Sequence, residues 1–359
     1  MILRTICACL WWAATTIAVW SPAPVSAATF PNLYRLTVQP DPAAADRRAA
    51  AAKLAMAGLL TRITGKRDAS LDPVLQPLID GAAGRFLQSY GFDRQGRAQV
   101  GFNATEVDRA LMELNYPVWG TERPLTLLWI AVDDGTGERA LLPANDTGTE
   151  VSPDMAKLLT DLRTELATVA DERGLPIVLP LVDLEDLQNV SFADIWGGFD
   201  DRVQSASQRY RPDVVLIGRV RPSAFGDDVQ WLLLAGGTRQ LITGTGVRDG
   251  LDAVADLYAA ELGVVGSGGT MRVTVLDVTT PADYARVISY LEGLSVLQSV
   301  DVDGLDGSAL QLRVTGRGDA QVLERVLALG GVLSAANSPG ATLPGNTLVF
   351  RMVRSGTTQ

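Results

Sequence analysis

The sequence predicts a multi-domain protein of the α/β and α+β classes, with a central mixed α/β sheet and a C-terminal ferredoxin-like unit. In the middle of the chain, apolar strand-like runs alternate with segments of helical spacing, which is typical of a sheet with helices on its faces. Towards the C-terminus the expected order of elements is β-α-β-β-α-β, the ferredoxin-like arrangement. A chain of 359 residues is also too long for one ordinary hydrophobic core.

Residues 1–27 are predicted to be a secretory signal peptide. Arg4 precedes an uncharged apolar stretch from Ile6 to Trp20, and Val25-Ser26-Ala27 offers the small residues expected before a cleavage site. The stretch is shorter than the roughly 20 residues that a membrane-spanning helix needs, which favours cleavage over an uncleaved anchor. We therefore expect a periplasmic protein with no stable membrane span after the signal is removed.

The first expected domain, residues 28–120, is of the α+β class. Residues 33–38 alternate between apolar and polar side chains, as a half-buried strand does. Residues 43–63 have apolar side chains at helical spacing, and Gly65 follows as a helix stop. A hairpin strand and a capped helix complete the domain, at 98–102 and from Asn103 or Thr105.

The second expected domain, residues 121–262, has the α/β pattern. Three apolar runs predict strands that are covered on both faces, at 125–132, 176–181 and 213–220. Helical spacing predicts the connecting helices, at 152–172, 199–210 and 249–262. An antiparallel pair of strands is expected at 229–234 and 239–243.

Residues 263–269 are rich in glycine and serine and are expected to form a linker. The third domain, residues 270–353, follows the ferredoxin-like order. Its strands are expected at 271–276, 296–302, 309–314 and 347–353, and its helices at 281–291 and from Asp319 to 329.

The composition excludes several classes of function. The chain has no histidine, and its two cysteines, Cys7 and Cys9, lie within the predicted signal peptide. After cleavage, Ser-His-Asp and Cys-His catalysis, zinc sites of histidine or cysteine, and disulfides are therefore all excluded. The net charge of −10 opposes binding to phosphate backbones, so no nucleic-acid partner is expected. No cofactor is expected either.

Acidic residues gather after the second buried strand, in what is expected to be a loop. They are Asp183, Glu185, Asp186 and Asp194. Ligands often bind at the carboxyl ends of strands in α/β sheets, and a group of carboxylates suits a hard cation such as Mg²⁺. The alternative is a solvated loop with helix N-termini, where aspartate is favoured. Trp196 follows in the same loop and is the best single candidate for a partner or ligand contact.

Six short segments form a recognisable pattern along the first two domains. They are Leu33 to Val38, Arg47-Arg48-Ala49-Ala50, Leu60-Thr61-Arg62-Ile63-Thr64-Gly65, Trp119-Gly120, Arg123-Pro124 and Leu127-Leu128-Trp129. The pattern resembles a bacterial exported family that is described only as domain-of-unknown-function family 2066. This resemblance implies no established reaction, cofactor or catalytic residue.

A second resemblance covers Arg211 to Gly218, where a strand follows Arg-Pro-Asp. The segment is similar to α/β domains of periplasmic envelope proteins, such as the amino-terminal domain of the Tol-system propeller protein. It implies only a class of function, because a fold can serve many functions. The leading hypothesis is therefore a non-enzymatic periplasmic protein that binds an envelope protein or assists envelope assembly. The alternative is a carboxylate- or metal-dependent periplasmic hydrolase that uses the Asp183–Asp194 acidic loop.

Overall fold

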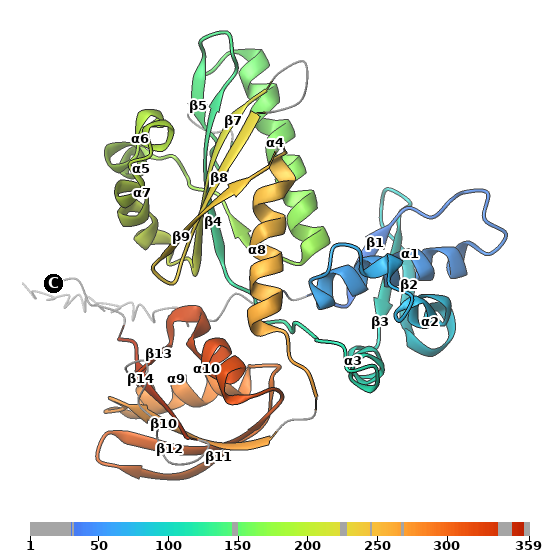
Figure 1. Ribbon diagram of the computed structural model, residues 1–359, viewed down its shortest axis with the longest axis vertical. Coiled ribbons are helices and arrows are strands. Elements are labelled where there is room, and N and C mark those ends of the chain that lie inside the picture. Colours follow the sequence, from blue (N-terminus) through green and yellow to red (C-terminus); the bar gives the residue numbers. More distant parts are fainter. Residues whose placement is uncertain are drawn as a thin grey trace, which may run out of the picture.

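Figure 1 shows the computed structural model of the chain, which describes residues 30, 32–145, 150–222, 228–244, 246–266, 269–336 and 347–354. The predicted signal peptide, residues 1–27, lies outside the described residues, and so do residues 267–268 of the predicted linker. Within the described part, no helix is long and apolar enough to cross a membrane. Three separate β-sheets, each with its own helices, confirm the predicted mixed α/β and α+β class.

The first sheet has three antiparallel strands in the order β1-β3-β2. These are β1 (Arg35–Val38), β2 (Leu87–Phe92) and β3 (Ala98–Phe102). Helix α1 (Arg47–Thr64) begins at Asp46, whose side chain accepts a hydrogen bond from the Ala49 amide, and ends at Gly65 in the left-handed region. The smaller helices are Ala69–Leu71, α2 (Gln76–Asp80), Ala82–Phe86 and α3 (Ala104–Glu113).

The central sheet has the order β5-β4-β7-β8-β9, with β6 beside the start of β4. Its strands are β4 (Thr126–Asp133), β5 (Arg139–Leu141), β6 (Ile177–Val178), β7 (Val214–Arg221), β8 (Asp228–Ala235) and β9 (Thr238–Thr243). Strands β6 and β7 are both parallel to β4, whereas β7, β8 and β9 form an antiparallel meander. Every residue of β4 is buried, as its continuous apolar run predicts.

Helices cover both faces of the central sheet (Figure 1). One face packs against α4 (Pro153–Arg173) and α8 (Val247–Leu262). The other face is covered by three short helices, α5 (Leu184–Asn189), α6 (Phe192–Gly197) and α7 (Asp200–Ser207). A further short helix, Gln208–Tyr210, connects α7 to β7.

The prediction of a buried strand over residues 176–181 was wrong in length and burial. Only Ile177–Val178 pairs with β4, and both residues are half-buried. Pro176 and Pro180 bracket this pair, and proline cannot donate a ladder hydrogen bond. The strand therefore ends early, and the chain leaves the sheet before the acidic residues begin.

The C-terminal sheet has the order β11-β12-β10-β14-β13, and α9 and α10 lie on one of its faces (Figure 1). The strands are β10 (Gly269–Leu276), β11 (Leu297–Asp306), β12 (Ala309–Gly316), β13 (Leu333–Ala335) and β14 (Thr347–Met352), and the helices are α9 (Pro281–Glu292) and α10 (Ala320–Ala328). One detail departs from a simple β-α-β-β-α-β unit, because the short strand β13 follows α10. The chain then turns back, so that β14 runs parallel to β10.

Buried arginines join the first unit to the central one. The guanidinium of Arg123 has no exposed surface and forms no ion pair with a carboxylate among the described residues; it donates to four backbone carbonyls, those of Gly120, Trp119, Arg62 and Arg173. The carbonyls of Arg62 and Arg173 belong to the last turns of α1 and α4. A cation at these two helix C-termini is favoured by the helix dipoles and satisfies carbonyls that lack a helical partner. Burial lowers the pKa of Arg123.

Polar contacts also join the C-terminal unit to the rest of the chain. Glu122 accepts hydrogen bonds from the amide (2.5 Å) and hydroxyl (2.6 Å) of Ser295. Arg317 forms an ion pair with Asp108 of α3 at 3.0 Å. Val264, which falls in the predicted linker 263–269, is buried and forms an antiparallel bridge with Val118.

Candidate functional site

The predicted acidic loop is helical. Asp183 is the N-cap of α5 and accepts a hydrogen bond from the Asp186 amide at 3.0 Å. Asp194 lies in α6, where it forms a capping box with Ser191, and Trp196 lies in the same helix. The prediction that these residues lie in a loop was therefore wrong. The alternative expectation of helix N-termini is confirmed, because Asp183 caps α5 and Asp194 lies in the first turn of α6.

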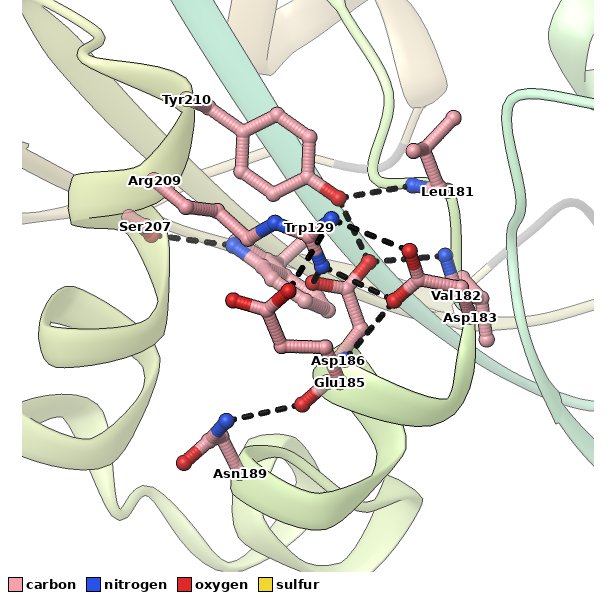
Figure 2. Close-up of polar contacts among 10 residues, drawn as sticks. All are labelled: Trp129, Leu181, Val182, Asp183, Glu185, Asp186, Asn189, Ser207, Arg209 and Tyr210. Atoms are coloured by element: carbon pink, nitrogen blue, oxygen red, sulfur yellow. Dashed lines mark hydrogen bonds and ion pairs between the residues drawn. The ribbon is translucent and has the colours of Figure 1, made fainter.

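Arg209 brings three of the predicted site residues together (Figure 2). Its Nη1 lies 2.8 Å from Asp183 Oδ1 and 2.9 Å from Asp186 Oδ1. Its Nη2 lies 3.0 Å from Asp183 Oδ2 and 3.5 Å from Glu185 Oε2. The arginine thus forms a bidentate pair with Asp183 and neutralises much of the negative charge of the cluster.

Asp186 is the buried member of this cluster, with 1% of its surface exposed. Its Oδ2 accepts from the Val182 amide at 2.8 Å and from the Tyr210 hydroxyl at 2.5 Å, and that hydroxyl in turn accepts from the Leu181 amide at 2.9 Å (Figure 2). Burial, followed by the hydrogen bond to Asp186, raises the pKa of Tyr210 to about 12. The phenol is therefore neutral near pH 7 and acts as a donor to the carboxylate.

The cluster is fixed to the central sheet through Trp129 of β4. The indole Nε1 donates to the Ser207 hydroxyl at 3.0 Å, and the ring meets Tyr210 edge-on at a centroid distance of 6.5 Å. Trp129 is fully buried, as its position in a predicted strand suggests. Val182 has φ of 53°, which is strained for a β-branched residue. The hydrogen bonds of Asp186 and Tyr210 hold the chain in this conformation.

Asp194 and Trp196 belong to separate contacts. Asp194 forms an ion pair with Arg202 at 2.9 Å. Trp196 stacks on Phe192 at a centroid distance of 5.0 Å, and Arg221 lies 5.2 Å from the indole ring. The structure therefore divides the predicted acidic group into two clusters, each with its own arginine.

A second charged group lies next to Trp196, at the C-terminal end of β4. Asp133 is buried and forms ion pairs with Arg221 (3.0 Å) and Arg139 (3.2 Å). Arg139 also lies over the ring of Phe192 at 5.4 Å. Hydrogen bonds, first from the Gly135 amide and then from Arg221, lower the pKa of Asp133. Sequence reasoning missed this group because its members come from three different elements.

The electrostatics of Asp183 do not suit a general acid. Arg209 lowers the pKa of Asp183 to about 2, so this carboxyl is ionised throughout the neutral range. A general acid needs the opposite shift, towards the working pH. Among the described residues, no three His, Cys, Asp or Glu side chains are arranged to hold a metal ion. The guanidinium of Arg209 itself contacts all three carboxylates that were candidates for a cation site.

The pKa of Asp183 predicts a pH-dependent contribution to stability. Because its folded pKa lies below the ordinary value of 3.8, the ion pair stabilises the protein above about pH 4. This contribution is lost as the pH falls from about 4 to about 2, where Asp183 becomes protonated in the folded state. The variant Arg209→Gln is therefore expected to be less stable than the wild type at pH 7, and the difference should shrink below pH 4. Urea unfolding midpoints of both proteins at several pH values measure this effect, with Arg94→Gln at an exposed arginine as control. A difference that stays constant down to pH 2 would contradict the assignment.

Helix α5 buries a charged residue and exposes apolar ones. Its buried residue is Asp186, whereas Leu184 and Leu187 are 74% and 53% exposed. Leu181, just before the helix, is 47% exposed. Residues three apart on a helix share one side, so Leu184 and Leu187 form an apolar patch beside the Arg209 cluster. We call Leu181, Leu184 and Leu187 the α5 leucine patch.

Comparison with known families finds a match for the first part of the chain only. A family described as a domain of unknown function (DUF8605) matches residues 27–120, which include the first sheet and its helices. No curated protein and no solved structure matches the chain. The matched family is not the predicted family 2066, so the comparison supports an uncharacterised domain and no more.

Two of the segments that carry the predicted resemblance, 60–65 and 119–120, meet between the first and central units. The amide of Trp119 donates to the carbonyl of Ile63 at 2.7 Å, so the segment 60–65 contacts the segment 119–120 directly. Arg62 and Arg123, one from each side of this contact, are both buried. These residues connect the first and central units and leave the α5 to α7 layer as the exposed candidate site.

Proposed function

We propose that this protein is a non-enzymatic periplasmic accessory protein that binds an envelope protein through the layer formed by α5, α6 and α7. The observation that supports the proposal most directly is the α5 leucine patch. A short helix that buries an aspartate and exposes two leucines lacks the stabilisation that burial of those leucines in the protein core would provide. Exposed apolar patches with polar rims are typical of protein interaction sites.

The rigidity of the patch supports the same function. Arg209, Tyr210 and the backbone of residues 181–182 hold the start of α5 through charge-assisted and buried hydrogen bonds. A surface that is already ordered loses little conformational entropy when it binds a partner. The cluster of carboxylates would then serve to position the leucines rather than to carry out a reaction.

The charge around the patch indicates the chemistry of the partner. Next to the patch, the carboxylates of Asp183, Glu185 and Asp186 share one arginine, Arg209, whereas Asp194 and Asp200 each have an arginine of their own. The excess negative charge favours a partner surface that carries basic residues around an apolar contact. Association should therefore weaken as salt is added, because exposed charges are screened.

The predicted location is part of the proposal. The apolar N-terminal stretch and the residues Val25-Ser26-Ala27 support export and cleavage. The predicted resemblance to family 2066 supports the same exported class. The second candidate, a hydrolase using Asp183, Glu185 or Asp186, is less well supported because Arg209 contacts all three carboxylates.

A photo-crosslinking residue placed at Leu184 is expected to capture an envelope protein in intact cells. The same residue at Leu71 is the matched control, because Leu71 is 77% exposed but lies in the first unit. With purified partner, Leu184→Asp should weaken binding at least about tenfold, as substitution at an interface centre does, whereas Leu71→Asp should leave it unchanged. Equal capture at both positions, or capture of cytoplasmic proteins alone, would contradict the proposal. So would hydrolysis of a glycan or phosphoester that is abolished by Asp183→Asn.

A further inference from the structure

A pocket lies where the three units meet, away from the α5 to α7 layer. Its volume is about 340 Å³, within the range of small-molecule sites. Its lining comes from Tyr34 and helix α3, from the segment 118–122, and from Ser295, Val296 and Arg317 of the C-terminal unit. Each unit thus contributes side chains to one partly open pocket.

The charged groups that line this pocket are two carboxylates and one arginine. Asp108 is buried and accepts from the Tyr34 hydroxyl, and it forms the 3.0 Å ion pair with Arg317. Glu122, only 3% exposed, accepts hydrogen bonds from Thr121 and Ser295, which are neutral donors. The lining therefore carries one more negative charge than positive charges. A buried carboxylate with neutral partners has a strong electrostatic preference for a nearby cation.

The charge of Arg123 interacts with that of Glu122, but the N–H groups of Arg123 are bound elsewhere. Arg123 lies against the face of Trp119, with 3.6 Å from its guanidinium carbon to the ring centroid, and its N–H groups donate to backbone carbonyls. Trp119 separates it from the pocket as part of the wall. The indole Nε1 of Trp119 is buried with no hydrogen-bond partner among the described residues, which is unusual for a buried tryptophan.

The rest of the lining is apolar. Met112, Val118, Leu262, Val264, Val296 and Val326 contribute aliphatic side chains. A site with an apolar body and a few converging polar groups suits a ligand with a compact apolar part and one charged end. From the charge balance and this lining, we infer that the pocket binds an organic amine, with its ammonium group at Glu122 and Asp108 and its apolar body against Trp119.

Three probes of one shape test this inference on the full chain by isothermal titration calorimetry. Benzylamine carries the ammonium group, benzyl alcohol is neutral, and benzoate is an anion. Benzylamine is expected to bind with a dissociation constant of about 1 mM or tighter. The alcohol should bind at least about tenfold more weakly, and benzoate should not bind, because the one arginine among the described lining residues, Arg317, is paired with Asp108.

Two variants test whether benzylamine binds in this pocket. Glu122→Gln removes the negative charge and should weaken the binding of benzylamine at least about tenfold. Ala104→Phe adds a ring to the half-buried first residue of α3 in the lining, and it should block the probe without changing any charge. Circular dichroism shows whether each variant is folded, and Glu185→Gln at the α5 layer is the matched charge control. The inference fails if benzylamine produces no binding heat, if the three probes bind alike, or if Ala104→Phe binds benzylamine as well as the wild type does.

Discussion

Replacing Arg123 with methionine is expected to lower the free energy of unfolding by about 3 kcal/mol or more. The methionine keeps most of the apolar volume but leaves four backbone carbonyls without their donor, and the bonds to three of them are buried. A buried acceptor that loses its partner costs about 1–3 kcal/mol. Two of these carbonyls also lie at helix C-termini, where the cation is favoured by the dipole.

The control for this prediction is the exposed residue Arg94. Arg94→Met should change stability by less than about 0.5 kcal/mol, as surface substitutions usually do. Arg123→Lys separates charge from geometry, because lysine keeps the charge but cannot reach several carbonyls from one planar group. We expect the stability of Arg123→Lys to lie between those of the wild type and Arg123→Met, as measured by urea unfolding that is monitored by circular dichroism. Equal stability of Arg94→Met and Arg123→Met would show that the first and central units do not depend on this contact.

Arg123 illustrates what the sequence could not predict. The sequence contains 31 lysines and arginines, and nothing in its local pattern distinguishes the buried arginines from those on the surface. Burial of Arg62, Arg123 and Arg173 becomes possible only where helix ends and strand carbonyls from separate units meet. The only signal was the resemblance of the segments around Arg62 and Arg123 to a family pattern. Those segments contain buried residues that connect the units, so the resemblance points to structure and not to a functional site.

Several elements predicted from local chemistry were confirmed. The all-apolar strand β4 is buried throughout, and Asn103 and Asp319 cap α3 and α10 as expected. These features depend on neighbours within a few residues, so periodicity and capping rules are enough to find them. The three-residue strands β5 and β13 were missed because such short segments carry no measurable alternation.

The candidate site was found only in part, for a related reason. Asp183, Glu185 and Asp186 are close together, as expected, but the side chain that organises them is Arg209, 23 to 26 residues further along the chain. Asp194, although near in sequence, pairs with Arg202 instead. The sequence shows that carboxylates lie near one another, but it does not show which arginine contacts them. That contact depends on the fold. The exposure of the α5 leucines was not predicted either, because these residues were expected to lie in a loop and the burial of Asp186 depends on Arg209 and Tyr210.

Replacing Gly65 with alanine is expected to be one of the most destabilising single substitutions in the chain, at about 3 kcal/mol or more. Gly65 ends α1 with φ of +70°, and a Cβ atom there would lie 1.9 Å from the Cβ of Ala259 in α8. The left-handed backbone costs an alanine about 1–2 kcal/mol. The overlap adds a larger cost, because α1 and α8 must separate, and this movement also disturbs the 2.8 Å hydrogen bond from Arg173 to the Gly65 carbonyl.

Gly96 provides a control that isolates the overlap from the backbone strain. Its φ is +78°, but a Cβ atom there meets nothing within 4 Å, so Gly96→Ala should cost only about 1–2 kcal/mol. The double variant Gly65→Ala with Ala259→Gly tests the cause directly, because it removes the atom at 1.9 Å and leaves the Cα of residue 259 at 3.4 Å, an ordinary contact. In the Ala259→Gly background, the cost of Gly65→Ala in urea unfolding should fall to that measured for Gly96→Ala. If the cost is unchanged in that background, the contact between α1 and α8 is not what requires glycine at this position.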